Sequence, residues 1–326
     1  MITLILGGGG SGKSAYAESL VVANGAENRY YLATMATTDE ESLRRIHRHQ
    51  EMRRGKGFET IECPVRLEEI FLPQKGDILL ECMSNLVANE LFEPNGRREH
   101  TAERIMEGVL SLEKQASHLF IVSNNVFEDG LNYPGDTENY LRILAEVNYR
   151  IAERASVVIE SVQGIPLYLK ADDSVKMCMS ETGNEKMEEQ LMKGPGVFIT
   201  GGSYQGKLDW AKNYLKQKKQ MTIPENTVWD GENGLPESWD NIFILDNLHQ
   251  LVRWYLEQQL DPKELTEILT SKDGLVIITD EVGCGLVPLT AFDRDWRDAS
   301  GRVGCDIATV SKSVYRMTCG VAQKIR

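Results

Sequence analysis

Eight residues near the start of the chain have the composition and spacing of a phosphate-binding loop. Residues 7–14 read GGGGSGKS and fit the pattern G-x-x-x-x-G-K-[ST]. Glycines let such a loop wrap with its N–H groups pointing inward, and the N-terminus of a following helix adds partial positive charge. The lysine would reach the β- and γ-phosphates, and the serine hydroxyl would bind Mg²⁺. The motif predicts a nucleoside triphosphate site formed by Gly7, Gly8, Gly9, Gly10, Ser11, Gly12, Lys13 and Ser14.

The residues on either side of this loop give it the setting that the motif requires. Residues 2–6 form a short apolar, partly β-branched run typical of a buried strand, and residues 15–21 suit a helix. A strand, a glycine loop and a helix start together distinguish a phosphate loop from a glycine-rich turn that binds nothing. The setting therefore favours the phosphate loop.

Glu81 is a candidate partner for the loop, because it ends the apolar run 78–80. If that run is a strand of the same sheet, its end should lie beside the phosphate loop. An acid there suits a second anchor for Mg²⁺, directly or through water, with Ser14 as the first. The alternative is a solvated carboxylate at a strand end, and we favour the metal role.

A basic segment, residues 42–54, is the second place where the chain could do chemistry. It carries His47, His49 and five arginines, and a face of this kind could meet a triphosphate. Positions two apart on a helix point about 200° apart, so the two histidines cannot both face one ligand. No third or fourth ligand for a metal is evident. From the residues alone, a solvated helix face is the simpler interpretation, and a catalytic histidine is the alternative.

The elements that must position these residues alternate along the first half of the chain. We expect strands at 2–6, 29–33, 77–80, 118–123 and 156–161, and helices at 14–23, 40–54, 99–116 and 137–154. Such alternation predicts an α/β fold with a mostly parallel sheet, helices on both faces and a ligand site at the carboxyl ends of the strands. Together with the glycine loop it predicts a RecA-like P-loop NTPase domain.

The second half of the chain repeats the first. Residues 197–207 match residues 3–13 at an offset of 194, and residues 119–170 match the end of the chain at an offset of 156. The loop residues align in pairs, Gly7 with Gly201, Gly12 with Gly206 and Lys13 with Lys207. We predict a duplicated domain, with copies at 1–170 and 195–326 and a polar linker at 171–194.

The second copy is shorter and lacks one group of the phosphate site. Residues 79–81 match residues 244–246 at an offset of 165, which implies a deletion of about 29 residues after the second loop. This deletion would remove the counterparts of residues 33–35 and of the histidine segment. Leu208 stands where the first copy has Ser14, so the hydroxyl for Mg²⁺ is missing. We expect a structural or regulatory second copy, and nucleotide binding there stays open.

The composition fits a cytoplasmic enzyme. The net charge of −13 over 326 residues argues against wide contact with nucleic-acid phosphates or anionic lipid. No apolar run approaches the roughly 20 residues of a membrane span, and the start lacks the cationic region of a signal peptide. Six cysteines without a C-x-x-C pair fit reduced thiols better than disulfides or zinc.

A family resemblance rests on several motifs in fixed order. These are GGGGSGKS, YLATM, the His49 segment, ETIECP, LLECMSNLVANELF and a final strand–helix–strand. In this order the chain resembles the bifunctional adenosylcobinamide kinase/adenosylcobinamide-phosphate guanylyltransferases of cobalamin assembly. The resemblance covers residues 1–170 nearly end to end and 195–326 as a shortened, diverged copy. The glycine loop alone would identify only a nucleotide-binding superfamily.

The resemblance implies two reactions on a corrinoid substrate. Adenosylcobinamide would be phosphorylated by ATP or GTP, with Lys13 and Mg²⁺ stabilising the phosphate charge. GMP would then pass from GTP to adenosylcobinamide-phosphate through a guanylylated histidine, which His49 matches. Besides the glycine loop, the family's nucleotide-site positions fall on Ala33, Thr34, Met35, Gln50, Glu51, Met52, Arg53, Glu62 and Glu81.

The chain departs from the family pattern in its last strands. That pattern reads roughly N-E-V-G-x-G-x-V-P and then R-x-x-R-D-x-x-G-R-x-N, and the second copy holds most of it, including Glu281, Arg297 and Asp298. We expect the halves to share one composite site for the corrinoid, as neighbouring subunits of a homo-oligomer or an intramolecular pseudo-oligomer would. The alternative is that the second half only scaffolds.

Two other function classes stay open on the sequence. Another P-loop small-molecule kinase would need no histidine, and a GTP-sensing regulatory protein would bind nucleotide without corrinoid turnover. The residues also leave open the choice between ATP and GTP and whether kinase activity is retained.

Overall fold

The computed structural model describes residues 1–36, 43, 46–47, 50–51, 53–129, 133–171, 194–219 and 224–326. The chain divides into two compact units. The first consists of Met1–Gly7, Lys13–Ser161 and Pro166–Lys176, and the second of Gly8–Gly12, Val162–Ile165 and Met177–Arg326.

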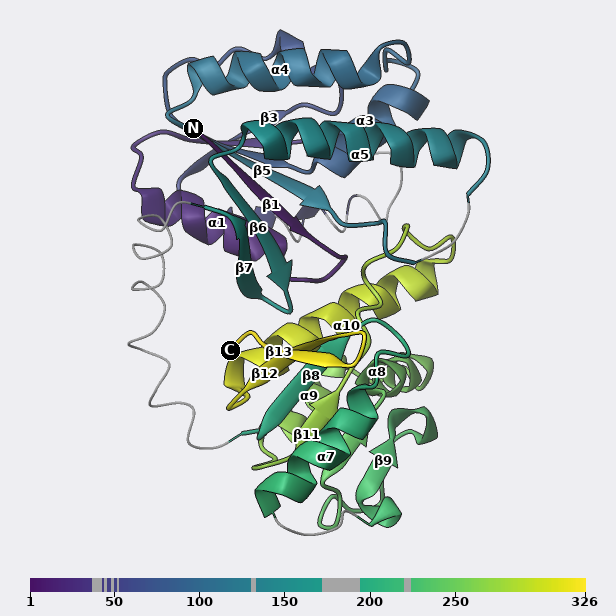
Figure 1. Ribbon diagram of the computed structural model, residues 1–326. Helices are drawn as coiled ribbons and strands as arrows, with labels where there is room; N and C mark the ends of the chain where they lie inside the picture. Colours follow the sequence, from purple (N-terminus) through teal and green to yellow (C-terminus); the bar gives the residue numbers. More distant parts are fainter. Residues whose placement is uncertain are drawn as a thin grey trace. The chain divides into compact units, whose positions relative to one another are not determined.

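The first unit is built on a seven-stranded sheet with the strand order β3-β2-β4-β5-β1-β6-β7 (Figure 1). From β3 to β6 every neighbouring pair is parallel. The strands are β1 (Ile2–Gly7), β2 (Arg29–Ala33), β3 (Phe58–Glu62), β4 (Asp77–Glu81), β5 (His118–Asn124), β6 (Val157–Val162) and β7 (Ile165–Lys170). All parallel strands therefore end at the same edge of the sheet.

Helices cover both faces of this sheet, with α1 on one side and the other three helices opposite (Figure 1). They are α1 (Lys13–Asn24), α3 (Met83–Phe92), α4 (Thr101–Gln115) and α5 (Asp136–Arg154), and η1 (Leu67–Glu69) is a short 3₁₀ turn. Phe120 and Val122 of β5 pack with Ala17 and Val21 of α1. Because side chains alternate along a strand, the intervening Ile121, also buried, faces the opposite helices. The central strands are apolar on both faces because both are covered.

The second unit has a six-stranded sheet in the order β13-β12-β8-β11-β10-β9. Its strands are β8 (Val197–Gly201), β9 (Val228–Asp230), β10 (Ile244–Asp246), β11 (Val276–Ile278), β12 (Val314–Thr318) and β13 (Val321–Lys324). Its helices are α7 (Lys207–Lys219), α8 (Leu248–Glu257), α9 (Pro262–Thr270) and α10 (Ala291–Val310), with 3₁₀ turns η3 (Glu225–Thr227) and η4 (Gly231–Asn233). The order matches that of the first sheet without an equivalent of β3.

Strand pairing reproduces the sequence repeat. Leu4 pairs with Ile121 in the first sheet, and Phe198 pairs with Ile277 in the second. These pairs differ by the offsets of 194 and 156 found in the sequence. Both copies also finish with a two-residue turn in which both residues have positive φ, Gln163-Gly164 and Cys319-Gly320. This is the conformation of a type I′ hairpin turn.

The deletion in the second copy lies later than the spacing of the motifs suggested. Asp230 ends β9 opposite Asp246, just as Ala33 ends β2 opposite Glu81. β9 is therefore the equivalent of β2, and among the described strands of the first sheet only β3 has no equivalent in the second. The prediction that the counterpart of Ala33 is deleted was wrong. β9 has only three residues, VWD, and they do not resemble the sequence of β2, RYYLA, so the repeat in the sequence does not reveal this strand.

The predicted α/β fold with helices on both faces is confirmed, and the predicted strands agree with β1, β2, β4, β5 and β6 to within a residue or two. In the first unit, the strands β3 and β7 and the helix α3 were not predicted. The sequence of β3, FETIE, lacks an apolar run because it lies at the edge of the sheet. Among the described helices, none combines the length and apolarity that crossing a membrane requires. The domain boundaries at 170 and 195 stay predictions.

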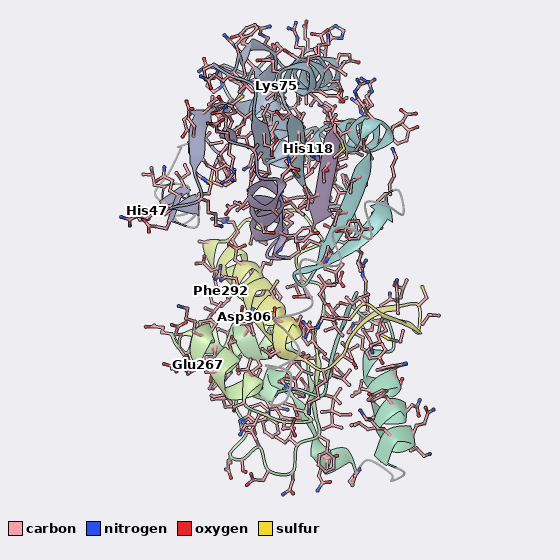
Figure 2. The ribbon with its side chains drawn as sticks, turned by 90° about the vertical axis from the view of Figure 1, so that its left-hand side faces the viewer. His47, Lys75, His118, Glu267, Phe292 and Asp306 are labelled. Carbon is pink, nitrogen blue, oxygen red and sulfur yellow. The ribbon has the colours of Figure 1, made fainter. Side chains whose placement is uncertain are left out.

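His118, at the start of β5, is a buried titratable group within the first unit (Figure 2). Its ring stacks on Phe120 with 4.0 Å between centroids, and Nε2 lies 2.9 Å from the Thr3 hydroxyl. Burial, with a smaller effect of the N-terminal ammonium, lowers the pKa of His118 to about 4. The folded unit therefore favours the neutral ring.

We expect the first unit to lose stability as the pH falls from 6.5 towards 4. In this range the unfolded imidazole takes up a proton that the folded site does not, which costs about 2 kcal/mol between pH 7 and pH 5. Urea unfolding followed by far-UV circular dichroism should show a shallower pH dependence in His118→Asn. The same substitution at the exposed His100 is the control and should leave the pH dependence unchanged. Equal slopes for wild type and His118→Asn would contradict this assignment.

Candidate functional site

The glycine loop connects β1 to α1, as the motif predicts. Gly10 and Gly12 have φ of 72° and 82°, in the left-handed region where glycine is favoured. The N–H of Ser11 donates a 3.2 Å hydrogen bond to the carbonyl of Gly8, which closes a turn within the loop. Lys13 is the first residue of α1, and its side chain is 8% exposed. The loop therefore delivers a buried lysine to the carboxyl end of the sheet.

Ser14 and Glu81 are in direct contact, although 67 residues separate them in the sequence. The Ser14 hydroxyl donates a short hydrogen bond to Oε1 of Glu81 at the end of β4. The second carboxylate oxygen, Oε2, is buried and has no hydrogen-bond partner among the described residues. A hydroxyl and a carboxylate side by side, with one carboxylate oxygen unsatisfied, form a pair of oxygen ligands that suits Mg²⁺.

Strand register brings three predicted residues to adjacent strand ends. Ala33 of β2 stands opposite Glu62 of β3 on one side and opposite Glu81 of β4 on the other. Glu62 is exposed, whereas Ala33 and the following Met35 are half-buried. These residues therefore form a row along the edge of the sheet where the glycine loop begins.

Thr34 joins this row to the next loop through reciprocal hydrogen bonds. Its hydroxyl donates to the Cys82 carbonyl at 2.9 Å and accepts from the Cys82 N–H at 2.7 Å. Asn89 of α3 donates to the carbonyls of Thr34 at 2.7 Å and Pro64 at 2.8 Å. Thr34 thus joins the backbone just after β2 to the backbone just after β4. Asn89 holds the residues that follow β2 and β3.

Asn89 was not among the predicted site residues. It lies in the stretch LLECMSNLVANELF, from which the sequence analysis selected only Glu81. An asparagine in the middle of a helix is a signal for such a role, because an amide shielded from water needs hydrogen-bond partners. The sequence could not show which partners it has, since both are backbone carbonyls far away along the chain.

The histidine segment is described only in part. His49 and Met52 lie outside the described residues, so the structure does not place the predicted nucleophile. His47 is exposed (Figure 2), and Gln50 and Glu51 are exposed as well.

The end of the histidine segment is held to the sheet. Arg53 is buried, with its guanidinium carbon 3.5 Å from the ring centroid of Tyr31 in β2. Lys56 forms a 2.6 Å ion pair with Glu18 of α1, whose side chain is fully buried. The chain that follows His49 is therefore anchored to the elements that carry the glycine loop and Ala33.

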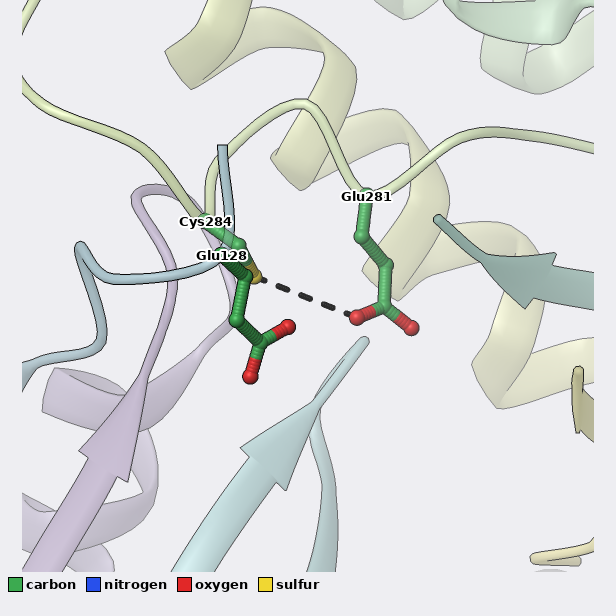
Figure 3. Close-up of side chains that lie close together, drawn as sticks. All are labelled: Glu128, Glu281 and Cys284. Carbon is green, nitrogen blue, oxygen red and sulfur yellow. Dashed lines mark hydrogen bonds between the residues drawn. The ribbon is translucent and has the colours of Figure 1, made fainter. Parts of the chain in front are cut away.

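In the second unit, the predicted substrate residues are engaged in internal contacts. Glu281 accepts hydrogen bonds from Arg316 at 3.0 Å and Thr200 at 3.3 Å. The sulfur of Cys284 lies 3.9 Å from Oε2 of Glu281 (Figure 3). Asp298 is 4.0 Å from Arg302 on the same helix. The composite site concerns both units together and stays a prediction.

Arg297 organises the loop that precedes α10. Its guanidinium donates hydrogen bonds to the backbone carbonyls of Gly283 at 2.5 Å, Gly285 at 2.8 Å and, over a short distance, Leu286. The side chain is 8% exposed. These contacts give Arg297 a structural task, the shaping of residues 283–286, that the sequence analysis did not foresee.

Comparisons with known proteins identify relatives of this chain. The sequence model of the family described as "Cobinamide kinase / cobinamide phosphate guanyltransferase" matches residues 3–169 and 235–325. The bifunctional adenosylcobalamin biosynthesis protein CobU of Salmonella typhimurium is 28% identical over 184 residues, which are 52% of this chain and 100% of that protein. CobP of Pseudomonas aeruginosa, with the same description, is 31% identical over 179 residues, or 53% of this chain and 99% of that protein. The second matched segment supports a tandem, diverged second copy.

We expect Lys13→Ala to weaken binding of a nucleoside triphosphate about 10- to 100-fold, because the buried ammonium makes charge-assisted contacts with phosphate. Isothermal titration of the full chain with GTP and with ATP measures the change. Lys75→Ala, which removes an exposed lysine from the same unit, is the control and should bind like wild type (Figure 2). Equal affinities for wild type and Lys13→Ala would refute the nucleotide-site assignment.

Arg297→Ala should lower the free energy of unfolding of the second unit by about 2 kcal/mol, because it leaves backbone carbonyls without their donors. All five tryptophans lie between residues 210 and 296, so tryptophan fluorescence during urea unfolding reports on this unit alone. Arg297→Lys should lower the free energy of unfolding nearly as much, since one ammonium cannot reach all of the same carbonyls. The exposed Lys216→Ala is the control. A stable Arg297→Ala variant would show that these contacts are not structural.

Proposed function

Because the chain belongs to the cobinamide kinase / cobinamide phosphate guanyltransferase family, we propose that it acts on adenosylcobinamide and its phosphate in adenosylcobalamin assembly. The printed names of its relatives describe bifunctional proteins of adenosylcobalamin biosynthesis. The proposed cycle uses one nucleotide site for two steps, a phosphorylation and a guanylyl transfer.

The observation that carries this proposal is the contact of Ser14 with Glu81 beside the buried Lys13. A lysine, a hydroxyl and a carboxylate at the carboxyl end of a parallel sheet are the groups that phosphoryl transfer needs. The exposed Glu62 ends β3, which β2 and β4 separate from β5, and we propose that it contacts the nucleoside.

In the kinase step, the substrate hydroxyl attacks the γ-phosphorus of ATP or GTP. The new oxygen–phosphorus bond forms as the bond to the β-phosphate oxygen breaks, and the hydroxyl proton passes to water. Lys13 and the loop N–H groups stabilise the charge that moves onto the phosphate oxygens. The residues chiefly position the reactants and supply positive charge, because this reaction needs no covalent contribution from the protein.

Ser14 and Glu81 would hold Mg²⁺ in this site. The unpartnered Oε2 of Glu81 is the feature of the structure that fits such an ion. When bound, Mg²⁺ would neutralise charge on the β- and γ-phosphates. Lys13 and the glycine loop bind the phosphates independently of the ion, and the Ser14–Glu81 contact keeps both ligands in place.

In the transferase step, we propose His49 as the nucleophile. A neutral ring nitrogen attacks the α-phosphorus of GTP, and pyrophosphate leaves. An oxygen of adenosylcobinamide-phosphate then attacks the phosphorus, releases the histidine and yields adenosylcobinamide-GDP. A covalent intermediate divides one difficult displacement into two easier ones. The anchoring of Arg53 on Tyr31 supports a place for this segment near the strand ends.

We expect His49→Ala to abolish covalent labelling by α-labelled GTP and the guanylyl transfer that depends on it. The kinase activity should largely survive, because attack on the γ-phosphate needs no enzyme nucleophile. His47→Ala, which removes an exposed histidine of the same segment, is the matched control and should label normally.

The labelling is measured after denaturation, with α-labelled and γ-labelled GTP compared in parallel. Acid-labile, alkali-stable label from the α-position alone marks a phosphoramidate on histidine. Label carried by His47, or transfer by an unlabelled His49→Ala variant, would contradict the proposed intermediate.

A further inference from the structure

The second glycine loop keeps its lysine but turns that lysine inward. Lys207 begins α7, and its side chain is 7% exposed. Its Nζ lies 2.6 Å from Oδ1 of Asp280 and donates a 2.6 Å hydrogen bond to the carbonyl of Gly202 in its own loop. The ammonium that would meet a phosphate in a working loop is therefore paired with a carboxylate of the same unit.

Asp280 is held in this position from several sides. Ser203 of the loop donates a 2.7 Å hydrogen bond to Oδ2, and the backbone N–H of Asp280 lies 3.3 Å from Nδ1 of His249. Burial alone would raise the pKa of Asp280, but hydrogen bonds from Lys207 and Ser203 and the charges of His249 and Lys207 lower it overall. The carboxylate is therefore anionic, and it bonds to the lysine and to a loop hydroxyl as a bound phosphate would.

The comparison of the two copies shows what changed. Asp280 lies at an offset of 156 from Asn124, so the first copy has a neutral amide at this place. Asn124 directs its amide to Ser84 at 2.7 Å. The second copy also has Asp230 at the register position of Ala33. Both differences add negative charge beside the second lysine.

The surroundings of Lys207 oppose a further anion. Burial is the largest cause of the raised pKa of the neighbouring Asp246; the charges of Asp230 and Asp280 also raise it, whereas the Asn247 N–H and the charge of Lys207 lower it. The negative charge of Asp230 and Asp280 disfavours a further anion at this place. Leu208, in place of the Ser14 hydroxyl, packs against the apolar core under α7. The second loop thus has neither free positive charge nor a hydroxyl for a metal.

We propose that the second loop is a phosphate site permanently filled by the protein's own Asp280. Lys207 then serves as a structural ion pair of the second unit, and the loop takes no nucleotide while Asp280 is present. Removal of this carboxylate alone should uncover an anion site, because the glycine loop, the helix N-terminus and the lysine are all still there. The inference does not depend on the reaction proposed for the first copy.

Anion binding tests the proposal directly. We would use the full chain with Lys13→Ala, so that the first loop contributes little, and inorganic tripolyphosphate at low ionic strength as the probe. The readout is thermal unfolding followed by tryptophan fluorescence, since a ligand that binds the folded second unit raises its melting temperature. The parent should show no shift. Asp280→Asn, which installs the residue of the first copy, should show an upward shift that Lys207→Met then removes.

The controls separate this effect from a general change in charge. Asp209→Asn removes an exposed carboxylate from the first turn of the same helix and should behave like the parent. A Lys207-dependent shift in a chain that retains Asp280 would show that the loop is open and would overturn the proposal. The absence of a shift in Asp280→Asn would overturn it as well. Because dependence on Lys207 is the criterion, residual binding at the first loop does not affect the result.

A double-mutant cycle tests the ion pair without any ligand. Lys207→Met and Asp280→Asn should each lower the melting temperature of the second unit by several degrees, because each leaves one buried group without its partner. The double variant should lose less than the sum of the two single losses. Additive losses would overturn the assignment of Lys207 and Asp280 as a structural pair.

Discussion

The structure depends on how the protein compensates a buried ammonium at the carboxyl end of a parallel sheet. A glycine loop followed by a helix places a lysine there in both copies, and the two lysines are almost equally buried. A buried charge is costly unless it is paired. In the second copy Asp280 is a partner of Lys207, and the first copy carries Asn124 at the position that corresponds to Asp280. The exchange of an amide for a carboxylate is therefore one of the differences on which the proposed closure of the second loop rests.

The first copy prepares its site by fixing the ends of adjacent strands. The register of β2, β3 and β4 places Ala33, Glu62 and Glu81 in a row. Reciprocal hydrogen bonds between Thr34 and Cys82 hold the two loops that follow these strands. Preorganised groups of this kind stabilise charge without rearranging during a reaction. The contact between Ser14 and Glu81 extends the same row to the glycine loop.

The two copies of the duplicated domain differ in their strands and in the contacts of their polar residues. The second copy retains the strand order of the first but lacks β3 within the described residues, and it holds all five tryptophans. Glu281 and Arg297, which the sequence suggested as substrate residues, make contacts within the second unit. Lys207, which aligns with Lys13 of the first copy, forms an ion pair within its own unit. The second copy thus keeps the strand order of the first, while residues at its strand ends and in its glycine loop differ.

The sequence by itself determined the glycine loop, five strands of the first sheet, the duplication and the family, because each depends on local patterns or on a repeat. It also identified Glu81, since an acid directly after an apolar run must lie at a strand end. Only the tertiary structure decided that Ser14 contacts Glu81 and that Asn89 donates hydrogen bonds to two backbone carbonyls. It also decided that β9 is the equivalent of β2 in the second unit and that Lys207 pairs with Asp280. These contacts join residues far apart in the chain, and strand order and register, which no local pattern encodes, bring them together.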